Sequence, residues 1–263
     1  MSGAARISAI ARHLLDAHAA RSRFAGLEGG LAPRSVDEAY LVQQELVELW
    51  QEQGEGSGVG YKIALTSQAI RDLVGVSEPC AGTILAAMVH HGPAEIRRDG
   101  FVRLGLEFEL AVRIGRDVPP GREQDAASIR NHVDAVMPAF ELIEDRDADY
   151  SSLDANSLIA DNAWCGGIVL GAESAGWRDL DLATVPVTLD YNGEIETAVT
   201  GAAMGSPLAS LAFLANLLAR QGRPLRAGEL VMTGSTLATR FAVSGDTARY
   251  TVQGIGSVEL RVT

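Results

Sequence analysis

Short apolar segments bounded by turn residues fill most of the chain after residue 57, and they limit its possible folds more than any other feature. They predict strands over 60–65, 102–114, 136–143, 166–170, 185–191, 229–232, 248–252 and 257–262. A parallel doubly wound sheet needs a crossover helix between successive strands, and the sequence lacks this regular alternation. The pattern therefore predicts a mixed, β-rich fold.

The N-terminal part of the chain has helical periodicity instead. One apolar stripe predicts a first amphipathic helix and consists of Ile7, Ile10, Leu14 and Leu15. A second helix is predicted to begin at Ser35, because Ser35 and Glu38 have the spacing of a capping box. Four glycines between residues 54 and 60 follow this helix. We therefore predict a helical N-terminal region over 1–57 and a mixed β catalytic domain over 58–263.

The charge of the chain limits its partners. Its 22 basic and 34 acidic residues give a formal net charge of −12, which repels nucleic acid and anionic lipid. We therefore expect no nucleic-acid or membrane partner. No segment approaches the ~18 apolar residues of a spanning helix, and no secretion signal is apparent. The two cysteines, Cys80 and Cys165, fit a reducing compartment, so a cytoplasmic location is expected.

The segment 104–112 carries a pair of carboxylates on one side of a predicted strand. Side chains alternate across a strand, so Glu107 and Glu109 share the face opposite Leu106 and Phe108. Two residues of strand place them roughly 7 Å apart. A half-exposed strand with one solvated face would show the same pattern.

A third carboxylate, Glu141, stands alone in the apolar segment 136–143. A buried carboxylate without a partner is costly, and three that converge repel each other unless a cation holds them. Carboxylate oxygens suit Mg²⁺, Mn²⁺ or Ca²⁺ better than Zn²⁺. The periodicity leaves open whether the two strands meet.

Lys62 is the only lysine among the 22 basic residues. One explanation for the single lysine is that it survived by chance in a lysine-poor chain. The other is a role that requires a group able to lose its proton, which arginine cannot do.

Several segments follow one another in an order that resembles a known family. They are Gly60-Tyr-Lys-Ile-Ala-Leu-Thr66, Gly75-Val76, Gly82-Thr83, Glu107-x-Glu109, Met137-Pro-Ala-Phe-Glu141, Asp161-Asn-Ala163, Gly205-x-Pro207 and Gly234-Ser235. Together they resemble the 2-hydroxypenta-2,4-dienoate hydratase / 4-oxalocrotonate decarboxylase family, within the fumarylacetoacetate hydrolase superfamily. The resemblance extends from about residue 35 to the C-terminus.

The resemblance implies an α+β fold, in which a small helical N-terminal region precedes a mixed β-sandwich roll of the fumarylacetoacetate hydrolase C-terminal type. It implies Mg²⁺, with Mn²⁺ as a substitute, on Glu107, Glu109 and Glu141. It also places Lys62 beside the substrate, where we expect a nearby cation and burial to lower its pKa and make it the proton-transfer group.

The other implied positions concern substrate contacts and assembly. Asp161 matches an acidic position and is expected to be catalytic. Thr66 and Ser235 match polar positions and are expected to bind substrate. The family also implies a homo-oligomer, and a complex with another enzyme of the pathway is a further expectation.

The expected activity is that of a metal-dependent lyase, a hydratase acting on 2-oxo or 2-hydroxy-dienoic acids from the meta-cleavage of aromatic rings. The alternatives are a 4-oxalocrotonate-type decarboxylase, an acylpyruvate-type C–C hydrolase and a non-catalytic partner of an active paralogue. Cys80 and Trp164 depart from the family pattern, which implies an acidic residue near the first and a small residue at the second. They leave the particular substrate and reaction open.

Overall fold

The computed structural model describes residues 3–263, without the side chains at positions 69, 70 and 73. The larger sheet contains β1 (Gly58–Ala64), β2 (Cys80–Leu85), β3 (Val89–His91), β5 (Leu104–Ile114), β6 (Val133–Glu144), β7 (Cys165–Leu170), β10 (Leu230–Met232) and β11 (Arg240–Phe241). The smaller sheet contains β4 (Ala94–Ile96), β8 (Pro186–Tyr191), β9 (Glu194–Val199), β12 (Thr247–Val252) and β13 (Gly256–Val262). The helices are α1 (Gly3–Ala19), α2 (Val36–Glu52), α3 (Gln68–Val74), α4 (Ala126–Ile129), α5 (Ala155–Ala160) and α6 (Pro207–Arg220).

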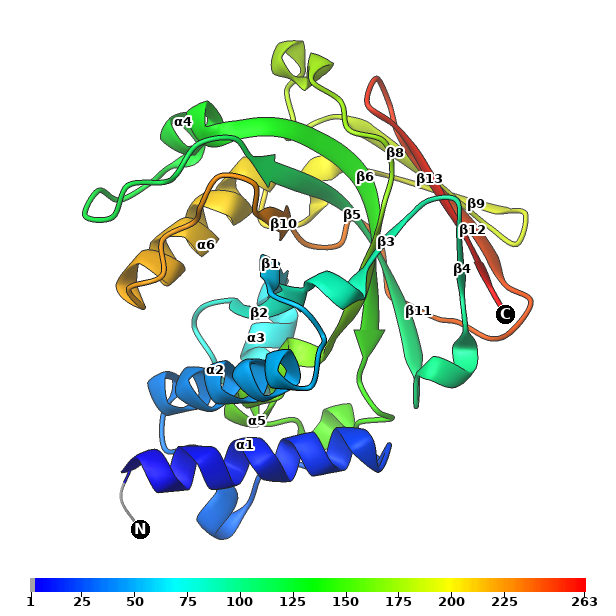
Figure 1. The fold of residues 1–263 in the computed structure, drawn as a ribbon. Helices are drawn as coiled ribbons and strands as arrows, with labels where there is room; N and C mark the ends of the chain where they lie inside the picture. The colour runs from blue at the N-terminus through cyan, green and yellow to red at the C-terminus, as the bar shows by residue number, and fades with distance from the viewer. Residues whose placement is uncertain (1–2) are drawn as a thin grey trace.

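Both sheets are mixed. The strand orders are β2-β1-β10-β5-β6-β7-β3, with β11 beside β5, and β4-β13-β12-β8-β9. The pairs β1–β10, β3–β7 and β4–β13 are parallel, whereas the central pair β5–β6 is antiparallel. Figure 1 shows β5 and β6 as long, curved strands, with α1 and α2 gathered at one end of the molecule. The predicted α+β fold with mixed sheets is therefore confirmed.

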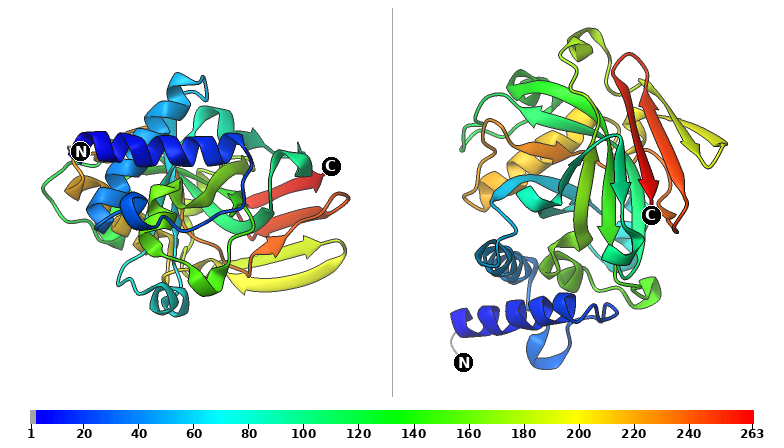
Figure 2. Two further views of the ribbon diagram at one scale, coloured as in Figure 1. Left: turned by 90° about the horizontal axis from the view of Figure 1, so that it is seen from below. Right: turned by 45° about the vertical axis from the view of Figure 1, so that its right-hand side comes forward.

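Aromatic side chains join the two sheets. Phe108 of β5 and Phe140 of β6 have ring centroids 5.9 Å apart, and Tyr250 of β12 lies 6.1 Å from Phe108. All three side chains are fully buried. The hairpin β12–β13 therefore packs against the face of β5 and β6 that carries no carboxylate cluster. The second view of Figure 2 shows this hairpin beside β5 and β6.

The N-terminal helices share the hydrophobic core of the sheet. Ser35 caps α2 by accepting a hydrogen bond from the Glu38 backbone N–H, as predicted, but Glu38 Oε2 accepts from the Arg34 N–H and does not complete the capping box. The side-chain amide of the buried Gln43 donates to the carbonyls of Ala81 and Ile159, which fixes α2 to β2 and α5. The division into 1–57 and 58–263 stays a prediction, because one apolar cluster spans both parts.

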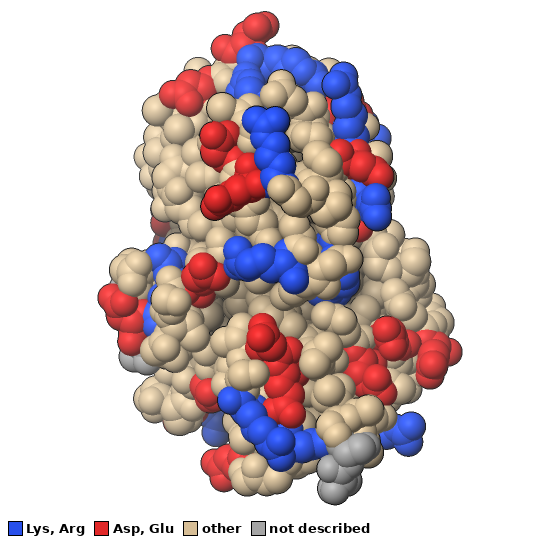
Figure 3. Space-filling model, turned by 90° about the vertical axis from the view of Figure 1, so that its left-hand side faces the viewer, with Lys and Arg blue, Asp and Glu red and all other residues tan. Residues whose placement is uncertain are grey.

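The surface carries both signs of charge. On the face drawn in Figure 3, acidic and basic side chains are interspersed among uncharged ones, and this face has no continuous basic patch. Within the described chain, each helix is too short or too polar to cross a membrane.

Candidate active site

Three carboxylates converge between β5 and β6. Glu107 pairs directly with Glu141 in the antiparallel register, and Glu109 follows two residues later on the same face of β5. One oxygen from each of the three side chains lies within 4.8 Å of the others. Glu109 and Glu141 are fully buried. The structure therefore brings together the three glutamates that the sequence singled out.

Fixed donors orient two of these carboxylates. The Thr239 hydroxyl donates to Glu107 Oε1 at 2.6 Å, and the Gly234 backbone N–H donates to Glu109 Oε2 at 2.7 Å. Gly234 has a φ of +101°, and a Cβ there would lie 2.8 Å from Thr66 Cγ2. Position 234 therefore requires glycine. The contact of Thr239 was not predicted, because its segment, 236–239, has no periodicity that would reveal it.

The donor set fits a divalent cation. Glu109 Oε1 and Glu141 Oε2 are buried, and neither accepts a hydrogen bond from any residue that the structure describes. Burial raises the pKa of Glu109, and the charges of Glu141 and Glu107 raise it further. Burial also raises the pKa of Glu141 to about 7, against the opposing charge of Lys62. Converging carboxylate oxygens are the ligands that Mg²⁺ and Mn²⁺ prefer, and either ion would relieve the repulsion among the three carboxylates.

Lys62 projects from β1 into the same cluster. Its side chain is 2% exposed, and its Nζ lies 2.7 Å from Glu141 Oε1. The expected lowering of its pKa supposes a cation on these carboxylates and stays a prediction. Burial does lower the pKa of Lys62, but the carboxylates of Glu141 and Glu107 outweigh burial and hold it above its ordinary value. Lys62 Nζ is thus the counter-charge to these carboxylates, and an ion held by the same carboxylates would offset their effect on its pKa.

A cavity of about 400 Å³ opens beside the cluster. Its polar side includes Lys62, Glu107, Thr66 and Ser235, so both predicted substrate-binding residues line it. The Ser235 hydroxyl accepts from the Phe108 backbone N–H and donates to the Leu237 carbonyl. In this arrangement its proton is directed at the Leu237 carbonyl, and donation to a ligand requires the hydroxyl to rotate. Neither Cys80 nor Cys165 is among the residues that line this cavity, and both thiols are buried.

Asp161 lies apart from this group. It is not among the residues that line the cavity, and its carboxylate is fully buried elsewhere. Oδ1 lies 2.7 Å from His18 Nε2, and Oδ2 accepts a hydrogen bond from the Arg146 guanidinium at 2.7 Å. Through these two contacts, Asp161 joins His18 of α1 to Arg146 in the segment after β6. Its expected catalytic role stays a prediction, and the structure gives this carboxylate a structural use.

We expect Asp161→Asn to lower the free energy of unfolding by about 3 kcal/mol or more, because it leaves the buried Arg146 without its anionic partner. Chemical denaturation of the variant measures this loss. The turnover number, measured at a temperature where the variant is fully folded, should stay near that of the wild type. A fall of 100-fold or more under those conditions would support the catalytic role instead.

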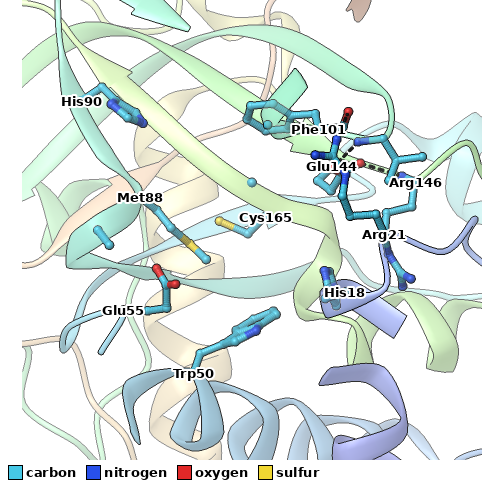
Figure 4. A pocket seen from close by; sticks show the side chains of 14 residues that line it. His18, Arg21, Trp50, Glu55, Met88, His90, Phe101, Glu144, Arg146 and Cys165 are labelled. Carbon is cyan, nitrogen blue, oxygen red and sulfur yellow. Dashed lines mark hydrogen bonds between the residues drawn. The ribbon is translucent and has the colours of Figure 1, made fainter. Parts of the chain in front are cut away.

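A second cavity of about 340 Å³ lies between the N-terminal helices and the end of β7 (Figure 4). Its charged walls are occupied by contacts within the protein. Arg21 donates to the Phe101 carbonyl, and Glu144 accepts from the backbone N–H of Arg146 at 3.1 Å. The Arg21 contact holds the end of the first helical segment to the segment before β5, whereas the Glu144 contact is local.

The fold and the carboxylate cluster define a recognised class of proteins. The model of the fumarylacetoacetate (FAA) hydrolase C-terminal family matches residues 81–263, and the chain belongs to this family. The resemblance read from the sequence is therefore confirmed.

The chain is also similar to particular members of this family. Over 262 residues, the chain is 35% identical to 2-keto-4-pentenoate hydratase 1 of Dechloromonas aromatica (strain RCB), with 98% of each chain covered. It is 30% identical to 4-oxalocrotonate decarboxylase of Pseudomonas putida, with 97% of this chain and 96% of that protein covered. Among solved structures, 4-oxalocrotonate decarboxylase from Pseudomonas putida G7, complexed with magnesium and adipate, matches with a TM-score of 0.90 at 28% identity. That match covers 98% of this chain and 97% of the other.

Proposed function

We propose that this chain is a metal-dependent hydro-lyase that adds water to a 2-hydroxy-dienoic acid of the 2-hydroxypenta-2,4-dienoate type. The observation that carries the proposal is the cluster of three carboxylates within 4.8 Å, with Lys62 Nζ against it and a cavity beside both. The similarity to a hydratase along 98% of the chain supports the same activity.

Glu107, Glu109 and Glu141 would hold Mg²⁺ or Mn²⁺. When bound, such an ion supplies a Lewis acid that stabilises negative charge on the oxygens of a 2-oxo acid. The chain's own residues would do the rest. Lys62 Nζ would give a proton to the far carbon of the dienol, which makes the adjacent carbon open to water. Thr66 and Ser235, on the polar side of the cavity, would orient the carboxyl end of the substrate.

Decarboxylation of a 4-oxalocrotonate-type acid is the second candidate. The observation that favours it is the TM-score of 0.90 to a decarboxylase over nearly the whole chain. Both reactions need an electron sink and one proton-transfer group, so the catalytic cluster alone is compatible with either.

A panel of 2-hydroxydienoates with Mg²⁺ separates the two candidates. Loss of the ultraviolet absorption of the dienol without release of CO₂ is expected for the hydratase. Release of one CO₂ per substrate would identify the decarboxylase. Absence of turnover with every acid, in protein that binds Mg²⁺, would instead favour the non-catalytic partner.

The proposal extends to the setting of the enzyme. We assign it to the catabolism of aromatic compounds through the meta-cleavage pathway, in the cytoplasm. The free thiols of the buried Cys80 and Cys165 support a reducing compartment.

We also propose a homo-oligomer, which several exposed apolar side chains support. Ile195 is 60% exposed and Val243 is 62% exposed. Light scattering after size exclusion should give a mass that is a multiple of the 27.8 kDa chain. A single species of one chain at micromolar concentration would contradict this expectation.

A further inference from the structure

The cavity beside the carboxylate cluster has two chemically different ends. Among the described residues that line it, the charged ones are Lys62 and Glu107, and both belong to the cluster. The far wall is apolar and includes Ile143, Leu153, Leu158, Ala163, Trp164 and Leu237. A ligand anchored at the cluster would therefore meet no cation at its other end.

The strand register places this wall beyond the cluster. Ile143 follows Glu141 by two residues on the same face of β6, roughly 7 Å further along the strand. Ile143 pairs with Cys165, the first residue of β7, so Trp164 enters the cavity at this level. Trp164 consequently limits the cavity at the end away from Glu141.

An unusual turn holds Trp164 in this position. Asn162, Ala163 and Trp164 have φ values of 52°, 50° and 57°, three successive residues in the left-handed region. L-residues with side chains rarely adopt this region, and such conformations persist where the surroundings enforce them. The Asn162 side chain accepts from the Thr83 N–H at 2.7 Å and donates to the Thr83 carbonyl at 2.9 Å, which fixes the turn to β2.

Two aromatic neighbours fix the indole itself. Its ring centroid lies 5.1 Å from that of Phe24 and 5.6 Å from that of Tyr150, both edge to face. Trp164 is 6% exposed, and its Nε1–H donates to no residue that the structure describes. The wall therefore presents a rigid, apolar surface.

The polar groups behind this wall are already used. The Tyr150 hydroxyl donates to Asp145 at 2.9 Å. The Arg103 guanidinium, 5.8 Å from the Tyr150 ring, donates to Asp145 and Asp147. One guanidinium faces two carboxylates, so the groups behind the wall provide no net positive charge for a ligand.

We infer that the far end of the cavity selects substrates with an uncharged tail, and that Trp164 is the specificity-determining residue that limits the tail and excludes a second carboxylate. The inference rests on the proposed function, because it places the 2-oxo carboxylate end at the cluster. At this wall a second carboxylate would lose its water and meet no cation, which is costly.

Binding of two unreactive 2-oxo acids of equal length tests this. In calorimetry with saturating Mg²⁺, we expect the wild type to bind 2-oxoadipate about 100-fold more weakly than 2-oxohexanoate. Leu153→Arg, at a half-buried position of the wall, should reduce this ratio at least 10-fold by supplying a cation. Trp164→Phe should preserve the ratio, since it keeps the apolar ring.

Trp164→Ala tests the limit on tail length. It should improve binding of 2-oxooctanoate relative to 2-oxopentanoate by 10-fold or more, and thermal melting establishes whether it folds. If it does not fold, Trp164→Phe and Leu153→Arg still decide the charge selection. If the wild type binds 2-oxohexanoate and 2-oxoadipate equally well, this inference is overturned but the proposed function is not. Binding of no 2-oxo acid would overturn the proposed function and the inference with it.

Discussion

The double variant Glu107→Ala/Glu109→Ala is expected to lose at least about 100-fold in affinity for Mg²⁺ and Mn²⁺. Loss of a single outer partner of a metal ligand already costs 10–100-fold, and this variant lacks two of the three carboxylates. The wild type should show one site per chain in calorimetric titration. Its melting temperature should rise with Mg²⁺, because a ligand that binds only the folded state stabilises it.

Two further variants make the result specific. Glu109→Gln keeps an acceptor for the Gly234 N–H but removes the charge, and should weaken Mg²⁺ binding in the same direction. Glu194→Gln removes one negative charge from the exposed strand β9 and should leave binding unchanged. Undiminished affinity in the double variant would rule out the proposed metal site.

Lys62→Arg and Lys62→Met are both expected to reduce kcat by 10²–10⁴-fold, about 3–5 kcal/mol of activation free energy. The reason is that proton transfer needs a group that can release its proton, and the guanidinium of arginine does not release it in proteins. Arginine can still neutralise Glu141, so a purely electrostatic role would leave Lys62→Arg largely active.

Metal affinity provides the control for this pair. Both variants should bind Mg²⁺ at least as well as the wild type, because neither removes a carboxylate. A Lys62→Arg variant with near-normal turnover would reduce Lys62 to a partner of Glu141. The explanation that the sequence keeps its single lysine for proton transfer would then fail as well.

Much of the fold could be predicted because its longer strands alternate or lie between clear turns. The predicted strand over 136–143 corresponds to β6, and the segment 102–114 corresponds to β5. The missed strand β2 is buried at all six positions, so it has no alternation, and its composition of small residues gives little β signal. The missed strands β3 and β4 have three residues each, too few for a period to appear.

The site was predicted in part. The spacing of Glu107 and Glu109 follows from strand geometry, but their meeting with Glu141 depends on the register of β5 with β6, which no local pattern specifies. The pKa of Lys62 depends on the same tertiary contact, because Glu141 and Glu107 raise it against the effect of burial. The position of Trp164 arises from three successive residues in the left-handed region, and the sequence Asn-Ala-Trp does not predict this conformation.

The parallel pairing of β1 with β10 has a consequence for how the enzyme is made. Gly60 of β1 pairs with Leu230 of β10, and the site residues Lys62 and Ser235 lie on β1 and just after β10. On the ribosome, β1 emerges long before its neighbour exists, and contacts of such sequence separation form slowly. Secondary structure should therefore return early during refolding from denaturant, whereas the capacity to bind Mg²⁺ should return last, when the C-terminal segment closes the sheet over Lys62.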